Sequence, residues 1–539
     1  MKLLTGVLLA CVLAATTPAV AQHDHPAGGA DQVGSASVSF QTSCAPALQQ
    51  DFNRAVALLH SFWFAQAIAA FDGIAAKDAS CAMAHWGAAL SRWGNPFAGL
   101  RSPQQIQLGS AAIQRALKTG SPTPRERAYI AATAELFTSG DAATQRARTL
   151  AYEQGMEGVA RAYPADMEAR IFYALAVNQT ALASDKKYSQ QLKAAAILEP
   201  LFKEHRTHPG LAHYIIHAYD HPPLAEKALE AARSYASLAP SVPHALHMPS
   251  HTFTRTGLWK ESIETNRRSA EAARKDNAAA EELHAMDYQT YAYLQIAKDG
   301  EARRMADEAR VAVARLDINA AGAAAPGVAG LFAAAAIPAR YALERGAWAE
   351  AAALTVRQTT FPYTDAITHF ARAIGAARSG NPKAAAADIE RLAALRDTLK
   401  TMQDAYWSEQ VDIQRNIAEA WVTFAEGNRG AGIDRLRAAA AAEDLTDKSA
   451  VSPGPLAPAR ELLGYMLLEA GRPAEALVEF QATVKKEPNR FRGLYGAARA
   501  AEAAGNRQTA TALYQQLLQV ASEPDADRPE LQHARTFVQ

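Results

Sequence analysis

The sequence predicts an all-α protein built from repeated pairs of helices. Hydrophobic residues make up 49% of the 539-residue chain, and long alanine-rich stretches favour closely packed helices. Apolar residues recur at intervals of three and four, whereas the strict alternation typical of strands is scarce. His213 and His247 lie 34 residues apart, and so do His217 and His251, as equivalent positions in successive copies of one unit would.

The N-terminus has the layout of a secretory signal. Residues 1–21 contain one lysine, an apolar run and a small-x-small end, so we expect cleavage after Ala21 and a periplasmic or secreted protein. A weaker lipoprotein-like pattern ends at Cys11 and is the alternative. Residues 22–42 are polar and rich in glycine and serine, which predicts a flexible leader.

Charge and hydropathy exclude two classes of partner. Lys plus Arg and Asp plus Glu number 55 each, so no excess charge favours nucleic acid or an anionic membrane surface. The most apolar later stretch, 323–339, contains two prolines and is shorter than the ~20 residues that span a bilayer. We therefore expect no nucleic-acid partner and no membrane span.

Cys44 and Cys81 remain after removal of the signal and lie 37 residues apart. Each stands just before a helical pattern, so a repeat of this length would place them at matching ends of neighbouring helices. An oxidising compartment then favours a disulfide between them. The alternative is two buried free thiols.

Helical periodicity begins near Cys44 and continues to the histidine-rich region. The expected helices are 47–62, 64–78, 81–94, 124–137, 149–163, 167–183 and 190–204. Further along, single glycines mark the turn within each pair, at Gly257, Gly300, Gly346, Gly380, Gly427, Gly471 and Gly505. Two of the steps between these glycines, 346 to 380 and 471 to 505, are again 34 residues.

The best single repeat, 459–490, has Leu463-Gly464, Gly471, Ala476, Phe480 and Pro488 in the tetratricopeptide pattern. The chain thus resembles the tetratricopeptide superfamily, which implies a right-handed solenoid of helical hairpins with a concave groove for a protein or peptide partner. Residues 208–217 (HPGxxHYxxH), 244–259 (HAxHMPSHxFxRxGxW) and 452–464 (SPGPLAPARELLG) further resemble a group of secreted bacterial tetratricopeptide proteins. That second resemblance implies architecture and export but no activity.

Composition predicts how the array is divided. We expect an N-terminal repeat segment, 43–316, that holds the histidines, and a C-terminal segment, 331–539. Residues 317–330 lack bulky periodic side chains and predict a hinge or linker. Residues 442–458 hold three prolines and predict a long ordered loop or a lid.

Histidines at helical spacing predict a transition-metal site in the groove. His213, His217 and Asp220 share one face of a helix, and His244, His247 and His251 recur on the next repeat. First helices of neighbouring repeats lie side by side, so His213, His217, His247 and His251 should converge within reach of one ion.

A third first helix adds Glu281, His284 and Asp287. His284 extends the candidate ligand set, and Glu281 or Asp287 is the candidate base for a metal-activated water. The full predicted ligand set is His213, His217, His244, His247, His251, His284 and Asp220.

Two residues limit the interpretation. Tyr214 stands where the HExxH helix of zinc proteases carries its catalytic glutamate, so that mechanism does not transfer. Pro249 lies between His247 and His251 and leaves the direction of His244 and His247 open.

Three hypotheses follow from the sequence. The first is an exported interaction protein with zinc, copper, nickel or iron bound in its groove, where Met248 slightly favours copper. The second is a metal-dependent hydrolase or oxidoreductase that uses metal-activated water. The third is a metal-free scaffold, whose histidines contact a peptide or small anion or only each other.

Overall fold

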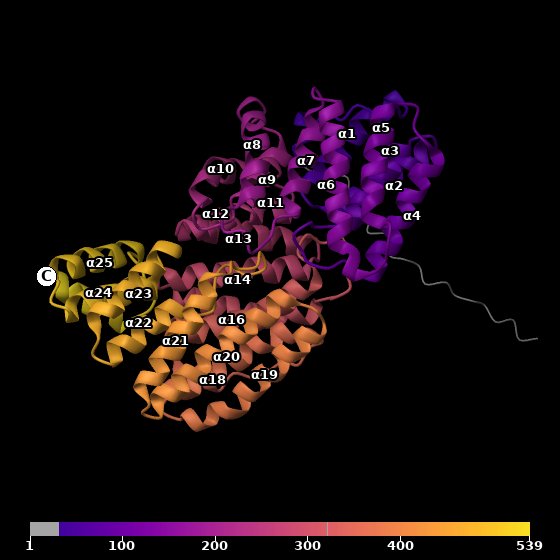
Figure 1. Cartoon of the computed structure of the whole chain (residues 1–539). Helices are drawn as coiled ribbons and strands as arrows, with labels where there is room; N and C mark the ends of the chain where they lie inside the picture. The colour runs from indigo at the N-terminus through magenta and orange to yellow at the C-terminus, as the bar shows by residue number, and fades with distance from the viewer. Residues whose placement is uncertain (1–31, 321) are drawn as a thin grey trace, which may run out of the picture. The chain divides into compact units, whose positions relative to one another are not determined.

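The computed structural model describes residues 32–320 and 322–539, and all regular secondary structure in these ranges is helical (Figure 1). The all-α prediction is therefore confirmed, with no strand in the described ranges. None of the helices described is long and apolar enough to cross a membrane. The predicted signal peptide 1–21 and residues 22–31 of the predicted leader lie outside the described residues.

The chain runs through α1 to α26 as a series of helices joined mostly by short turns. The first eight are α1 Gln49–His60, α2 Phe64–Lys77, α3 Ala82–Trp93, α4 Pro103–Thr119, α5 Pro124–Ala134, α6 Gln145–Ala162, α7 Met167–Gln179 and α8 Ser189–Glu204. The next nine are α9 Pro209–Ala218, α10 Leu229–Leu238, α11 Pro243–His247, α12 Pro249–Arg255, α13 Trp259–Lys275, α14 Ala279–Gln295, α15 Asp299–Ala312, α16 Gly327–Glu344 and α17 Trp348–Ala352.

The remaining helices are α18 Pro362–Arg378, α19 Ala386–Thr401, α20 Ala405–Ala425, α21 Arg429–Asp444, α22 Ala459–Glu469, α23 Pro473–Lys486, α24 Phe491–Ala503, α25 Arg507–Val520 and α26 Pro529–Val538. Short 3-10 turns are η1 Ser35–Ser37, η2 Pro46–Leu48, η3 Glu135–Phe137, η4 Ala142–Thr144, η5 Ala225–Ala228, η6 Val313–Arg315 and η7 Pro382–Ala385.

Consecutive helices pack against each other as antiparallel helical hairpins. The second helices of the last two full hairpins, α23 and α25, begin at Pro473 and Arg507, and 507 − 473 gives the 34-residue step. Phe480 of α23 packs on Gly496 of α24, where an added Cβ would lie 2.2 Å from the ring. The repeat thus depends on glycine at the point where two helices approach most closely.

Residues 32–42 differ from the predicted flexible leader. Val33, Val38 and Phe40 are buried, and the Phe40 ring packs 5.2 Å from the Trp86 ring, centre to centre. The glycine and serine content of this stretch suggested a solvated tail, but three apolar side chains are enough to hold it against the helices, because each buried side chain contributes about 1.5–3 kcal/mol.

The segment predicted as a hinge, 317–330, is also held in place. Helix α16 already begins at Gly327. In front of it, the carbonyl of Gly322 accepts from the N–H of Ala65 at 3.1 Å, and Glu281 accepts from the N–H groups of Ala324 and Ala325. Residues 32–539 form one compact unit, so the two predicted segments do not separate here.

Cys44 and Cys81 stand in front of α1 and α3, with their sulfur atoms at bonding distance and their Cα atoms 4.7 Å apart. The spacing argument made from the sequence therefore places them correctly. The bond closes a loop of 37 residues around α1 and α2.

We predict that replacing both Cys44 and Cys81 by alanine lowers the free energy of unfolding by about 3–4 kcal/mol, because the cross-link restricts the unfolded chain. Urea unfolding of the wild type and the double variant measures the difference. The wild type assayed in reductant should match the variant. Peptide mapping without reductant should recover the two cysteine peptides linked, and free thiols at both positions would contradict the prediction.

Candidate metal centre

Three helical segments bring six buried histidines together. Helix α9 carries His213 and His217, the α11–α12 segment carries His244, His247 and His251, and α14 carries His284. All six side chains are buried. These are the six histidines of the predicted ligand set.

Pro249 does not disturb the α11–α12 segment. Met248 keeps a right-handed helical conformation, with φ −52° and ψ −38°, and Pro249 is the first residue of α12. Proline in a first helical turn costs no hydrogen bond, since its missing N–H would be unpaired there anyway. His244, His247 and His251 therefore follow one helical face.

The first group of histidines, which we name triad A, consists of His213, His217 and His244. The Nε2 atom of His213 lies 3.1 Å from Nε2 of His217 and 3.2 Å from Nε2 of His244. One ring nitrogen from each of the three lies within 4.8 Å of the others.

The second group, triad B, consists of His247, His251 and His284. The Nε2 atoms of His247 and His251 are 3.0 Å apart, and the His284 ring lies 4.4 Å from the His247 ring, centre to centre. One ring nitrogen from each of these three also lies within 4.8 Å of the others.

The two triads differ from the single four-nitrogen set that the sequence predicted. The α11–α12 segment lies between α9 and α14 along the array, so its histidines divide, His244 toward α9 and the other two toward α14. The triads are still neighbours. The His217 and His251 rings are 6.3 Å apart, centre to centre, and the His244 and His247 rings have the same separation.

Hydrogen bonds behind three of the rings fix which nitrogen carries the proton. Nδ1–H of His213 donates to the carbonyl of His60 at 2.6 Å. Nδ1–H of His247 donates to Oδ1 of Asn266 at 2.7 Å, and Asn266 is itself oriented by donating from Nδ2 to the carbonyl of Ser262. Nδ1–H of His251 donates to Asp220 at 2.8 Å. Because these acceptors cannot donate, each ring presents an unprotonated Nε2 to the site.

Burial keeps the rings neutral. It lowers the pKa of all six imidazoles, to about 3 for His213 and for His284. In triad B, the Nε2 lone pairs of His247 and His251 therefore face each other at 3.0 Å with no proton between them. Two acceptors at this distance repel unless a positive centre lies between them.

The predicted carboxylates lie outside the ligand shell. Asp220 stands behind His251 and orients it. Glu281 accepts backbone N–H groups of the segment before α16, and Asp287 pairs with Arg340 at 2.8 Å. The geometry therefore does not support Asp220 as a ligand or Glu281 and Asp287 as bases next to the metal, because each carboxylate is engaged elsewhere.

Asp220 is the centre of a charge network that the sequence did not reveal. It accepts from Arg255 Nε at 3.0 Å and lies 3.6 Å from Lys448 Nζ. Burial lowers the pKa of Lys448 to about 8. Lys448 belongs to the part of 442–458 that follows the end of α21 at Asp444. The three prolines of 442–458 predicted a long ordered loop or a lid, and that was the one sequence signal that pointed to this region.

Aromatic rings support both triads. Phe62, directly after α1, packs on His213 at 4.4 Å between ring centres. Tyr288 of α14 contacts all three rings of triad B. The Tyr288 hydroxyl lies 3.2 Å from the carbonyls of Ala450 and Ser452, so it also ties the loop 442–458 to the site.

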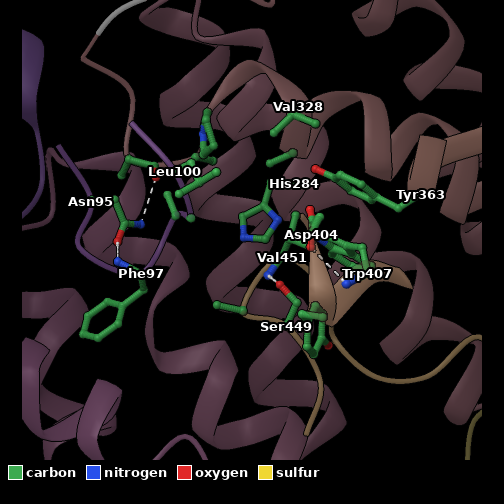
Figure 2. A pocket seen from close by; sticks show the side chains of 18 of the residues that line it. Asn95, Phe97, Leu100, His284, Val328, Tyr363, Asp404, Trp407, Ser449 and Val451 are labelled. Carbon is green, nitrogen blue, oxygen red and sulfur yellow. Dashed lines mark hydrogen bonds between the residues drawn. The ribbon is translucent and has the colours of Figure 1, made fainter. Parts of the chain in front are cut away.

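A pocket of about 410 Å³ opens in front of the histidines. In Figure 2, His284 lies between Asn95 and Leu100 on one side and Tyr363 and Trp407 on the other. Both triads reach it. Its full lining is Asn95, Phe97, Ala98, Gly99, Leu100, His217, His244, Met248, His251, His284, Ala324, Ala325, Pro326, Val328, Ala329, Tyr363, Gln403, Asp404, Ala405, Tyr406, Trp407, Ser449, Ala450 and Val451.

A third buried cluster, His60, Glu168 and His208, has a structural role. Both histidines place Nε2 on the Glu168 carboxylate, at 2.8 and 3.0 Å. The carboxylate thus pairs with the Nε2 atom of both histidines, which gives the cluster a charge partner without an ion, while Nδ1 of His208 has no hydrogen-bond partner among the described residues. The carboxylate also fixes His60, whose carbonyl holds His213. Gly210 allows this approach, since an added Cβ would lie 2.7 Å from the His60 ring.

We predict that Glu281→Gln reduces the dependence of stability on pH. Burial raises the pKa of Glu281 to about 7, so between about pH 4.5 and 7 the unfolded carboxyl releases its proton while the folded one retains it. The wild type therefore loses stability as pH rises through this window, by at most about 3 kcal/mol. Glutamine keeps the acceptor oxygen but cannot ionise.

Urea unfolding at several pH values measures this effect as the difference between variant and wild type. That difference should grow in favour of the variant from pH 4.5 to 7 and then level off. The same change at Glu390, exposed on α19, is the control. A difference independent of pH would contradict the prediction.

No protein-family model and no curated protein matches the chain. Among solved structures, the crystal structure of yeast Tom70 aligns at 10% sequence identity and covers 91% of this chain and 87% of that chain, with a TM-score of 0.29. A likeness at this level has no bearing on function, and the conclusions below depend on the site alone.

Proposed function

We propose that this chain is an exported metalloenzyme that binds two transition-metal ions, one in triad A and one in triad B, next to a small-molecule pocket. The observation that carries the proposal is the pair of unprotonated Nε2 atoms of His247 and His251, 3.0 Å apart, with both Nδ1–H groups committed to acceptors behind them. A cation between these lone pairs accounts for the contact.

The spacings within the triads support this assignment. Imidazole nitrogens bound at about 2.0–2.1 Å from one ion lie about 2.9–3.3 Å apart when the angle at the metal is between a right angle and tetrahedral. The three Nε2 to Nε2 distances, 3.0, 3.1 and 3.2 Å, fall in this range.

The surroundings of the two triads favour a catalytic metal site over a structural one. Three protein ligands per ion leave a coordination position free, which is the pattern of catalytic rather than structural sites. The rings of both triads reach a pocket whose volume suits a small molecule. An ion there would activate water or substrate as a Lewis acid or a redox centre, which is the hydrolase or oxidoreductase hypothesis made from the sequence.

Export is the part of the proposal that depends on the sequence. The signal-like residues 1–21 and the cysteine pair support a periplasmic or secreted location. The protein or peptide partner suggested by the helical array stays a prediction.

We predict that the protein, purified after export from the expressing cells, contains two transition-metal ions per chain. Elemental mass spectrometry measures this content. His217→Ala should remove the ion of triad A, and His251→Ala that of triad B, because each loses one of three ligands. Each single variant should keep about one ion and the double variant about none, with circular dichroism showing nearly unchanged helix content.

His533→Ala is the matched control, because His533 lies on α26 and bonds to Glu502, away from both triads. The His533→Ala variant should keep both metal ions. Wild-type protein that takes up less than a tenth of an equivalent of zinc, copper, nickel or iron would reject the metal centre.

We also predict that Asn266→Ala weakens metal binding at triad B by about 10- to 100-fold, because His247 then loses the acceptor that holds its Nδ1–H. Competition with a metal-binding dye measures the affinity. Asn266→Asp keeps an acceptor at the same place and should retain most of the affinity. Equal affinity in the alanine variant and the wild type would show that Asn266 does not orient His247.

A further inference from the structure

The donor set of both triads consists of neutral imidazole nitrogens. Asp220, the carboxylate behind His251, is already shared with the cations Arg255 and Lys448. Two divalent ions would therefore add four positive charges to a buried site with little negative charge to offset them, which is costly in a low dielectric. The lack of compensating negative charge favours metal ions that are stable with a single positive charge.

Copper meets this requirement among the metals that imidazole binds well. Copper(I) is monovalent and accepts three nitrogen ligands, and copper(II) stands highest among the divalent metals in affinity for such ligands. Met248, whose side chain carries a soft thioether sulfur, lines the same pocket. Two adjacent copper ions can together give or take two electrons.

The pocket lining indicates the class of molecule that reaches the ions. It contains no lysine or arginine, so no side chain of the lining offers an ion pair to a phosphate or a carboxylate. It does contain flat aromatic rings. Tyr363 and Trp407 stack in parallel at 4.2 Å between ring centres, and Phe97 stacks on His217 at 4.3 Å. A neutral, flat, aromatic molecule fits this lining.

We propose that the two triads hold a pair of copper ions that oxidises small ortho-diphenols with dioxygen. This inference rests on the proposed function and adds the metal and the substrate class. Each diphenol loses two electrons and the protons of its two O–H bonds and becomes an ortho-quinone. Dioxygen accepts four electrons and four protons from two diphenols, its O–O bond breaks, and two waters form.

The first test uses the metal-free full chain loaded with two equivalents of copper(I) or of zinc. An oxygen electrode and quinone absorbance follow the reaction with 4-methylcatechol. The copper form should consume one dioxygen for two diphenols, at least 100-fold faster than the same concentration of free copper, and the zinc form should consume none above background. A copper form no faster than free copper would overturn the inference.

The second test measures binding without turnover. Resorcinol, whose meta hydroxyls cannot give a quinone by loss of two electrons, is titrated calorimetrically into the zinc-loaded chain. Val328→Trp adds a large ring to the pocket lining (Figure 2) without replacing a histidine and should weaken binding at least tenfold. Leu117→Trp, on an exposed part of α4, is the matched control and should bind like the wild type.

The outcomes separate the two proposals. A chain that binds neither copper nor zinc rejects the metal centre and this inference with it. A chain that binds two copper ions but neither consumes dioxygen with the diphenol nor binds resorcinol rejects the copper oxidase alone and leaves the metal centre standing.

Discussion

Repulsion between unprotonated imidazole nitrogens is the constraint on which this structure depends. Nitrogens with outward lone pairs would separate if the rings were free to turn. Hydrogen bonds to His60, Asn266 and Asp220 hold three of the six rings from behind, and aromatic rings make edge contacts with two of these, His213 and His247. The fold therefore holds the Nε2 atoms of His247 and His251 in an arrangement that a cation would stabilise.

The groups that maintain the arrangement come from distant parts of the chain. His60 ends α1 and is itself fixed by Glu168 of α7. Asp220 follows α9 and joins Arg255 of α12 to Lys448 of the loop 442–458. Removing one member of a buried charge network of this kind costs about 3–5 kcal/mol. The contacts that hold the candidate metal centre are thus also contacts that pack the array.

The helical array and the histidine cluster could both be predicted from the sequence, because they depend on local spacing. The 34-residue offset correctly indicated that histidines of α9 and the next repeat are neighbours. The division into two triads was not predictable, since it depends on how far each ring turns toward α9 or α14. The roles of Glu281 and Asp287 were missed for a related reason. Their helical face was visible, but their partners, the backbone before α16 and Arg340, lie 43 or more residues away.

The burial of residues 32–42 is another feature that local sequence alone could not predict. A composition rich in glycine and serine describes the average of the segment, whereas its structure depends on three apolar side chains and the surface that receives them. Pro249 illustrates the opposite case. The sequence left its effect open because one proline either ends a helix or begins its first turn, and only the conformation of Met248 distinguishes the two.

The wall of the pocket has a consequence for how the protein is made. The six histidines are synthesised by residue 284, whereas residues 403–407 and 449–451, which line the same pocket, follow more than 100 residues later. On the proposed function, the chain presents the candidate ligands first and this wall of the pocket afterwards. An ion that binds before the later helices fold would then become enclosed. The order of the sequence would set the order of assembly, and the proposed metal centre would exchange its ions slowly.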